Sequence, residues 1–295
     1  MIAVFDIGGT SIKYGVLKET RTLDFIHQDE AETNAKKLGG EGVINKVCEL
    51  IVQLKKVYEI NGVAVSSAGV VNSKDGSIIY ANENIPNYTG MKVKELIEAT
   101  FQIPCTIEND VNCAALGEYT YGKNTISHSA FVLTIGTGIG GSLINDGIIY
   151  HGSSFLAGEI GYMLIDNKPF EHLASTSFLI NEVKTKTNEV DLNGKIVFER
   201  YKSNDNICID AVHSLCNNLA KGISNCVYLL NPEAIILGGG IMKQETILRP
   251  IIEKYLKQYL NNTFYNSFQL IFASLGNQAG MAGAYAHYQK EHSHD

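Results

Sequence analysis

The sequence predicts an α/β protein made of two similar lobes with an active-site cleft between them. Short apolar runs typical of buried strands alternate with amphipathic stretches typical of helices. A strand, a Gly/Thr-rich turn and a returning strand also occur twice, at residues 2–17 and 129–144. Such internal repetition points to two copies of one architecture. We therefore expect lobes of residues 1–118 and 119–278, with a C-terminal helix of about 279–295 that packs back on the first lobe.

The first lobe is expected to alternate strands with helices. The helix at 42–57 is indicated by apolar residues at helical spacing, such as Val43, Val47 and Leu50, with Lys and Glu between them. The expected strands are 2–6, 13–17, 62–66 and 105–108, and the expected helices are 42–57, 93–101 and 111–119.

The second lobe is expected to repeat this pattern. The expected strands are 129–135, 142–144, 234–237 and 269–273, and the expected helices are 210–230, 249–260 and a Gly/Ala-rich one at the C-terminus.

Composition excludes several classes of protein. The net charge of −7 and the lack of clustered Lys and Arg argue against nucleic acid as a partner. The six cysteines form no CxxC pair, so neither a disulfide framework nor a cysteine metal site is expected. No apolar run approaches the ~18 residues of a membrane span, and the N-terminus enters a strand without a charged leader. We expect a cytoplasmic protein that does not bind membranes.

A first candidate for phosphate binding is the turn DIGGT at residues 6–10. Paired glycines let the backbone approach a phosphate closely, and a Thr hydroxyl adds a donor. The Asp, at the end of a strand, could hold Mg²⁺ through water. The alternative is a Gly-rich hairpin turn whose Asp accepts backbone N–H bonds. The candidate ligand-binding residues here are Asp6, Gly8, Gly9, Thr10 and Lys13.

The second candidate is the loop at 136–141, which has four glycines in six positions after an apolar strand. Each glycine costs backbone entropy, so packing alone explains this density poorly. Because the loop lies at the equivalent place in the second repeat, we expect two phosphate-binding turns that face each other. The candidate residues are Gly136, Thr137, Gly138 and Gly140.

The third Gly-rich candidate is the triplet Gly238, Gly239 and Gly240, which follows a buried strand. It would form a flat backbone surface against which an adenine or a ribose could lie. The alternative is a tight turn into the next helix.

Two carboxylates are candidates for chemistry. Asp110, between a strand and a helix, is either an ordinary helix N-cap or a base within hydrogen-bond reach of a substrate hydroxyl. Glu159 lies in a Gly-flanked loop that would present it to a ligand. The histidines are weaker signals: His151 and His172 have no metal-like spacing, and the other six, including His287, His292 and His294, are expected to be solvated.

Taken together, these loops resemble the ROK family of bacterial sugar kinases and repressors, within the actin/hexokinase-like (ribonuclease H-like) fold. The resemblance covers nearly the whole chain. It runs through residues 6–10, 67–70, 84–87, 108–112, 136–141, 158–161 and 238–240.

The resemblance implies roles for particular residues. Asp110 would be the catalytic base, and the three Gly loops would hold ATP with Mg²⁺. The substrate-binding residues would be Gly69, Asn84, Asn109, Asp110 and Glu159.

The chain departs from the family pattern after Glu159. Tyr162 replaces the usual His, and the Cys-rich zinc loop is absent, although Glu171 is similar to the Glu at its end. We therefore expect a branch of the family without zinc, in which Tyr162 and Glu171 shape the pocket near the anomeric end of the sugar. No winged-helix region precedes the first strand, so operator binding is not expected.

The resulting hypothesis is phosphoryl transfer from MgATP to a hexose hydroxyl, with C6 favoured, by a homodimer. N-acetylmannosamine and a β-glucoside are preferred substrates, and glucose and fructose remain open. The alternative, motivated by the missing His and zinc loop, is a non-catalytic sugar or nucleotide sensor of the same fold.

Overall fold

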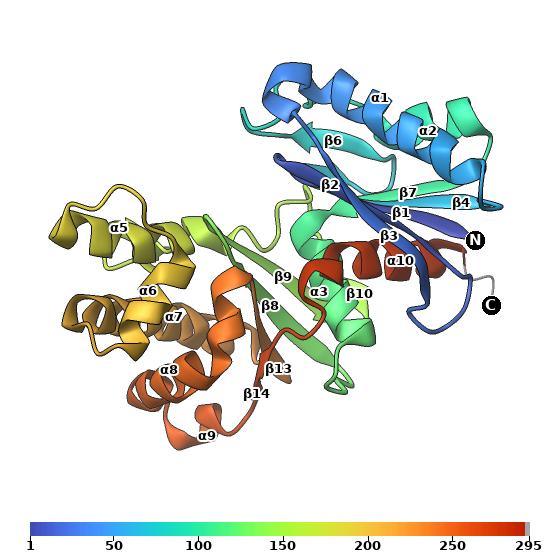
Figure 1. Ribbon diagram of the computed structural model, residues 1–295. Coiled ribbons are helices and arrows are strands. Elements are labelled where there is room, and N and C mark those ends of the chain that lie inside the picture. Colours follow the sequence, from blue (N-terminus) through green and yellow to red (C-terminus); the bar gives the residue numbers. More distant parts are fainter. Residues whose placement is uncertain (293–295) are drawn as a thin grey trace. The chain divides into compact units, whose positions relative to one another are not determined.

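The computed structural model describes residues 1–292 (Figure 1). The chain divides into two compact units, each of which contains its own five-stranded sheet. Unit 1 comprises Met1–Lys123, the short segment His151–Leu156 and the chain from Asn277 onward, and unit 2 comprises Asn124–Tyr150 and Ala157–Gly276. No helix among the described residues is long and apolar enough to cross a membrane.

The sheet of unit 1 has the order β3-β2-β1-β4-β7. Its strands are β1 (Ile2–Ile7), β2 (Ser11–Leu17), β3 (Phe25–Glu32), β4 (Gly62–Ser67) and β7 (Cys105–Asn109). The first three are antiparallel neighbours, whereas β4 and β7 run parallel to β1. Parallel strands end at the same edge of a sheet, so the ends of β1, β4 and β7 bring their polar residues together.

Helices cover both faces of this sheet, as Figure 1 shows. Along β1, Ala3, Phe5 and Ile7 pack toward α1 (Ala35–Lys55) and α2 (Val93–Phe101). Ile2 and Val4 point to the other face, toward α3 (Asp110–Tyr121) and α10 (Ala279–His292). The alternation follows from the two-residue period of a strand. A hairpin of β5 (Val70–Asn72) and β6 (Ser77–Tyr80) completes the unit.

The helices α3 and α10 lie unusually close together. A Cβ atom added at Gly283 would lie 1.6 Å from the carbonyl oxygen of Cys113, and one at Gly117 would lie 2.5 Å from that of Ala279. Only glycine allows the two backbones to approach this far. The contact matters for function because α3 begins at Asp110.

The sheet of unit 2 has the order β10-β9-β8-β13-β14 and repeats the pattern of unit 1, with three antiparallel neighbours followed by two parallel strands. Its strands are β8 (Ser129–Ile135), β9 (Ile139–Asn145), β10 (Ile148–Ile149), β13 (Ala234–Gly238) and β14 (Gln269–Phe272). The two mixed sheets with flanking helices confirm the predicted α/β class.

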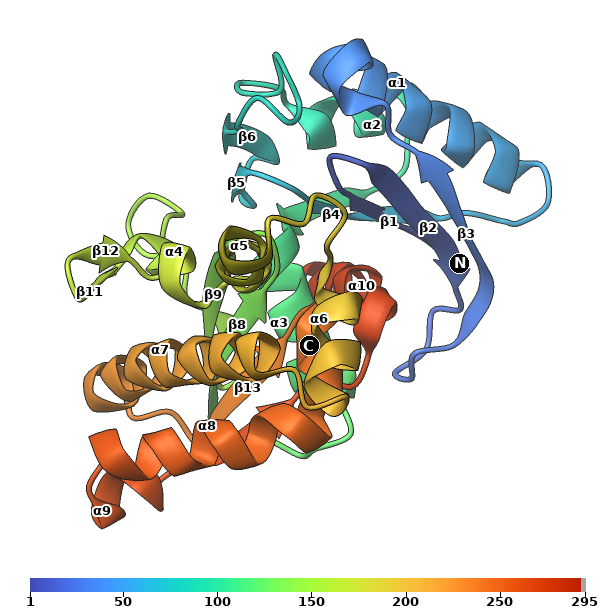
Figure 2. The ribbon, with the colours of Figure 1, turned by 60° about the vertical axis from the view of Figure 1, so that its left-hand side comes forward.

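The large core of unit 2 lies between this sheet and its helices. Phe131, Leu133 and Ile135 of β8 pack on α7 (Asn206–Leu230) and α8 (Glu245–Tyr259), which lie side by side (Figure 2). The remaining elements are β11 (Leu164–Ile165), β12 (Lys168–Pro169), α4 (Glu171–Ala174), α5 (Thr176–Thr187), α6 (Gly194–Lys202), α9 (Asn262–Tyr265) and the 3₁₀ turns η1 (Ile160–Tyr162), η2 (Gly240–Gln244) and η3 (Gly276–Gln278).

The observed elements differ from expectation mainly in their bounds and in the short pieces. Helix α1 begins at Ala35 rather than 42, because a first turn precedes a kink at Gly39, whose φ is +66°. A glycine at positive φ interrupts helical geometry, so the residues before 42 do not continue the helical spacing of apolar residues that predicts the rest of α1. The helices α5 and α6 and the strand β3 were not predicted.

Candidate active site

Asp110 lies where β7 ends and α3 begins. The N-cap of α3 is Asn109, whose Oδ1 accepts the Asn112 N–H at 3.0 Å, and Asp110 is the first helical residue. The Asp110 Oδ1 accepts the Val111 N–H at 2.9 Å and the Asn109 Nδ2–H at 2.9 Å. Among residues 1–292, the Oδ2 atom has no hydrogen-bond partner. The capping role is therefore filled by the neighbour, and the carboxyl of Asp110 keeps one oxygen available for a ligand.

The surroundings of Asp110 adjust its basicity. Burial, and then the negative charge of Asp6, raise the pKa of Asp110 to about 7. Asp6 accepts a hydrogen bond from Ser66 Oγ at 2.7 Å, and the Lys13 Nζ lies 3.7 Å from its Oδ2. A carboxyl with a pKa near the working pH is suited to accept a proton in catalysis.

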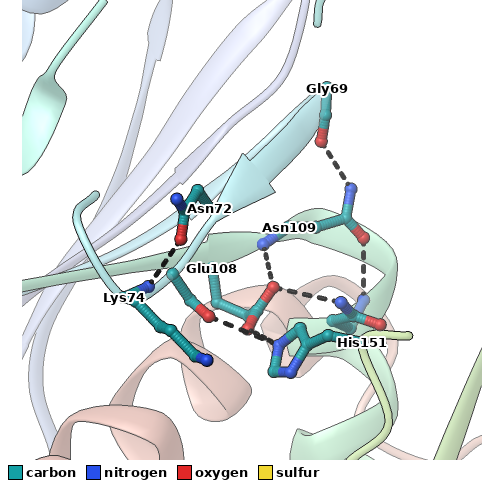
Figure 3. Close-up of polar contacts among 8 residues, drawn as sticks. Gly69, Asn72, Lys74, Glu108, Asn109 and His151 are labelled. Carbon is teal, nitrogen blue, oxygen red and sulfur yellow. Dashed lines mark hydrogen bonds and ion pairs between the residues drawn. The ribbon is translucent and has the colours of Figure 1, made fainter. Parts of the chain in front are cut away.

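Asn109 links Asp110 to the loop that carries Gly69, and Figure 3 shows the bond between Asn109 and Gly69. Its Nδ2 donates both to Asp110 and to the carbonyl oxygen of Gly69, the latter at 2.8 Å. Gly69 has φ +96°, and a Cβ there would lie 2.7 Å from the carbonyl oxygen of Tyr80. Glycine is thus required for this loop to present its carbonyl to Asn109.

The turn at 8–10 also belongs to unit 1. The Gly8 N–H donates to Ser11 O at 3.0 Å, and Gly8 O accepts the Thr33 hydroxyl at 2.9 Å. A Cβ at Gly9 would lie 3.4 Å from Cβ of Asn84, so the turn lies against the loop that carries Asn84. Unit 1 thereby holds Asp6, Gly8, Gly9, Thr10, Lys13, Gly69, Asn84, Asn109 and Asp110.

Unit 2 contains an open pocket of about 410 Å³. Gly136 and Thr137 line it together with Gly240, and the N-terminus of α6 supplies Asn193, Gly194 and Lys195. Its other lining residues are Thr176, Phe198, Ile241, Lys243 and Gln244. A helix N-terminus and two lysines suit an anionic ligand.

The glycines of this pocket test whether a nucleotide fits. A Cβ added at Gly136 or Gly240 would meet no atom of the described part of the chain within 4 Å, and neither residue has a positive φ. Neither packing nor backbone geometry therefore requires glycine there, and its effect is to leave space for a ligand. Gly239 differs, because its φ is +110° and a Cβ would lie 2.1 Å from Ile135 O. The residues present fit a nucleotide.

The predicted nucleotide residues do not all reach the pocket. Gly238 is buried at the end of β13, Gly239 packs on β8, and Gly140 lies within β9. The sequence reasoning in turn missed the contribution of α6. The Asn-Gly-Lys sequence at its start was the available signal, because Asn193 caps the helix by accepting the Ile196 N–H.

A second, polar groove of about 420 Å³ adjoins the first at Thr137. Gly138 and Glu171 line it, with His172, Ser175, Ser177, Phe178 and Asn181. The Glu171 carboxylate lies against two glycine loops, because its Oε2 would be 2.4 Å from a Cβ on Gly138 and 3.3 Å from one on Gly161. Burial and the charge of Glu171 raise the pKa of Glu159. Tyr162, on η1, is 69% exposed.

The expectation that His287 is solvated is wrong. It is 8% exposed on α10, because this helix is buried against the sheet, and its Nε2 has no hydrogen-bond partner among the residues that the structure describes. His151 has a partner that the spacing arguments missed: its Nε2 lies 2.6 Å from Glu108 Oε2. His292 is exposed, and His294 lies outside the described residues.

The sequence pattern of the ROK family matches residues 2–291. The chain belongs to the ROK family. A Clostridium perfringens protein described as uncharacterized is 48% identical over 98% of both chains. A beta-glucoside kinase of Listeria monocytogenes is 30% identical over 100% of this chain and 99% of its own.

Solved structures of ROK relatives have the same fold. A Listeria monocytogenes protein named as a candidate N-acetylmannosamine kinase is 30% identical, covers 99% of both chains and superposes with a TM-score of 0.85. The ROK family glucokinase of Streptomyces griseus, in complex with glucose and AMPPNP, is 25% identical with a TM-score of 0.81, over 96% of this chain and 97% of its own. These matches confirm the predicted ROK family and its fold. Within residues 1–292 no three His, Cys, Asp or Glu side chains are grouped to hold a metal, and the ROK branch without zinc stays a prediction.

Proposed function

We infer that this ROK protein is an ATP-dependent carbohydrate kinase that phosphorylates a hexose-type hydroxyl, with C6 as the acceptor position. The observation that carries the proposal is the state of Asp110. Its neighbour Asn109 caps α3, one carboxyl oxygen stays available, and the pKa of about 7 gives a base at neutral pH. The kinase relatives that match over the full chain support the same reaction class.

Asp110 acts as the general base toward the acceptor hydroxyl. Its Oδ2 accepts the hydroxyl proton, while the hydrogen bonds to Oδ1 from Val111 and Asn109 keep the carboxyl oriented. When bound, MgATP supplies the phosphoryl group, and the metal neutralises its charge. We propose that Asp6 holds this Mg²⁺ through water.

The phosphate-binding residues of this chain supply positioning. We propose that Gly136, Thr137, Gly240 and Lys195 hold the nucleotide in unit 2, and that Gly8, Gly9, Thr10 and Lys13 contribute from unit 1. Backbone N–H groups and a helix N-terminus stabilise phosphate charge without reorganising during the reaction.

The sugar is the finer part of the proposal. We propose Asn84, Asn109, Glu159, Tyr162 and Glu171 as its ligands, and a β-glucoside or N-acetylmannosamine as substrate, ahead of glucose and fructose. An exposed aromatic ring at Tyr162 would suit a sugar that carries a substituent. The relatives carry both substrate names at 30% identity, so they do not choose between these sugars. We also propose that the protein works as a homodimer.

Measurement of ADP release across a panel of these four sugars tests the proposal. The Asp110→Asn variant should lose about 10²–10⁴-fold in turnover, because it lacks the base, while it still binds the sugar. Near-normal turnover by this variant would show that Asp110 is not the base. Silence of the native protein with every sugar, despite ATP binding, would instead favour a sensor.

A further inference from the structure

Glu108 is a fully buried carboxylate directly before the Asn109–Asp110 corner. Its side chain is 0% exposed. Its Oε1 accepts the Asn109 N–H at 2.7 Å and the Asn112 Nδ2–H at 3.0 Å. Glu108 therefore bonds both to Asn109, the N-cap of α3, and to Asn112, whose N–H donates to that cap. Glu108 is thereby connected to the N-terminal cap of α3, the helix that begins at Asp110.

The other oxygen of Glu108 is paired with His151 (Figure 3). The Nε2–Oε2 distance is 2.6 Å, and the imidazole is the donor because an ionised carboxylate can only accept. The His151 side chain is 25% exposed, and Ser73 Oγ lies 3.4 Å from the same nitrogen. The Glu108 carboxylate is thus shielded from solvent, whereas the His151 side chain is partly exposed.

The electrostatics of this corner favour an ionised Glu108. Burial alone would raise the pKa of Glu108, but the hydrogen bond and charge of His151, followed by the charge of His287 and the Asn112 bond, lower it below its usual range. The Cys113 thiol of α3 also faces the carboxylate, and the pKa of this thiol is raised by burial and by the charges of Glu108 and Asp6. Without His151, a buried carboxylate would lose its strongest partner, which is costly.

The bond between Glu108 and His151 also joins two segments of unit 1 that are distant in sequence. Residues 124–150 belong to unit 2, the chain enters unit 1 at His151 and leaves it after Leu156, and Glu159 follows. His151 is therefore the first residue of the returning segment, and its bond to Glu108 joins that segment to the end of β7 across 43 positions in sequence. Asp110 lies two positions after Glu108, and Glu159 lies eight positions after His151. Both are predicted functional residues.

We propose that Glu108 and His151 form a positioning pair that holds the Asn109–Asp110 corner in the geometry needed for proton removal, an inference that rests on the proposed function of Asp110. Neither residue touches the reacting atoms. Their effect passes through Asn109 N–H and the Asn112 side chain to the cap of α3. Small displacements of a catalytic group cost much of the rate, so loss of the pair lowers kcat.

The test compares His151→Ala, which removes the donor, with His151→Gln, which keeps a neutral one. We expect kcat of His151→Ala to fall on the order of 10²-fold, with most of it recovered in His151→Gln. The KM for ATP and the binding of AMPPNP should stay within about twofold, because the pocket in unit 2 contains neither partner. His128→Ala, which removes an exposed histidine paired with Asp146, is the matched control and should keep full activity.

A double-mutant cycle with Glu108→Gln measures the coupling. The loss in the Glu108→Gln/His151→Ala variant should be clearly smaller than the product of the two single losses, because the buried charge and its partner go together. If His151→Ala does not fold, this double variant and His151→Gln carry the test. A lowered melting temperature with unchanged kcat per folded molecule would overturn the proposal.

Asp110→Asn separates this proposal from the one on which it rests. If Asp110→Asn is inactive and the variants at His151 turn over normally, only the positioning role fails. If Asp110→Asn is active, the proposed base is wrong, whatever the variants at His151 do.

Discussion

At the scale of residues, the environment decides what each carboxylate can do. Glu108 and Asp110 are two positions apart, yet the pKa of the first is lowered and that of the second is raised to about 7. The difference follows from their neighbours: Glu108 has His151 within hydrogen-bond distance, whereas Asp110 is near the negative charge of Asp6. A buried carboxyl with a lowered pKa and one with a pKa near 7 thus lie two residues apart, where β7 ends and α3 begins.

This difference predicts how stability depends on pH. Because the folded-state pKa of Asp110, about 7, lies above its unfolded value of 3.8, the folded protein binds the proton more tightly, and stability falls as pH rises from about 4 to 7. Asp110→Asn should therefore stabilise the protein by about 1–3 kcal/mol above pH 7 and by little near pH 4. Denaturant unfolding without nucleotide or Mg²⁺ at both pH values measures this. An equal effect at the two pH values would contradict the raised pKa.

At the scale of elements, glycines in neighbouring positions serve different purposes. Gly239 at the end of β13 needs its positive φ and has no room for a side chain, whereas Gly240 at the start of η2 faces the open pocket. The first shapes the chain and the second leaves space for a ligand. The motif of three glycines does not reveal this division.

We predict opposite effects of Ala at these two positions. Gly240→Ala should raise the KM for ATP roughly tenfold with little change in stability, because its methyl group occupies ligand space. Gly239→Ala should instead destabilise the protein by about 1–3 kcal/mol, because of its φ and the clash with Ile135. Steady-state kinetics and thermal unfolding of both variants measure this. Unchanged ATP kinetics in Gly240→Ala would show that the nucleotide lies elsewhere.

At the scale of the whole molecule, each unit has its own core and its own part of the chemistry. Unit 1 carries the proposed base, and its support is the close contact of α3 with α10. Unit 2 carries the proposed nucleotide pocket and has no residue of α10. The last helix of the chain is therefore expected to matter for catalysis more than for nucleotide binding.

Gly283→Ala tests this division. The added methyl would lie 1.6 Å from Cys113 O, so α3 and α10 must separate, at a cost of about 1–3 kcal/mol or more. We expect a lower melting temperature and a lower kcat, with AMPPNP affinity retained, as measured by calorimetric titration. Lys290→Ala, at an exposed position of the same helix, is the control. Loss of nucleotide affinity in step with kcat would contradict the prediction.

Much of this protein could be predicted from local sequence. Strands such as β1 and β4 are short apolar runs, and the amphipathic part of α1 is visible in its period, because burial of one face imposes that pattern on neighbouring residues. The repeated strand–turn–strand unit indicated two similar sheets, and the motifs around Asp110 indicated the ROK family. These features depend on residues close in sequence, where patterns are readable.

Only the tertiary structure decided how distant residues meet. The partner of His151 is visible only in the fold, which brings His151 to Glu108. The burial of His287 could not be predicted, because α10 is buried on nearly all sides and its sequence therefore has no amphipathic pattern. The contribution of Lys195 and the difference between Gly239 and Gly240 likewise depend on what lies opposite each residue in space. The sequence alone determined the class of fold and the candidate functional side chains. Packing between segments distant in sequence determined which of these residues lie near one another.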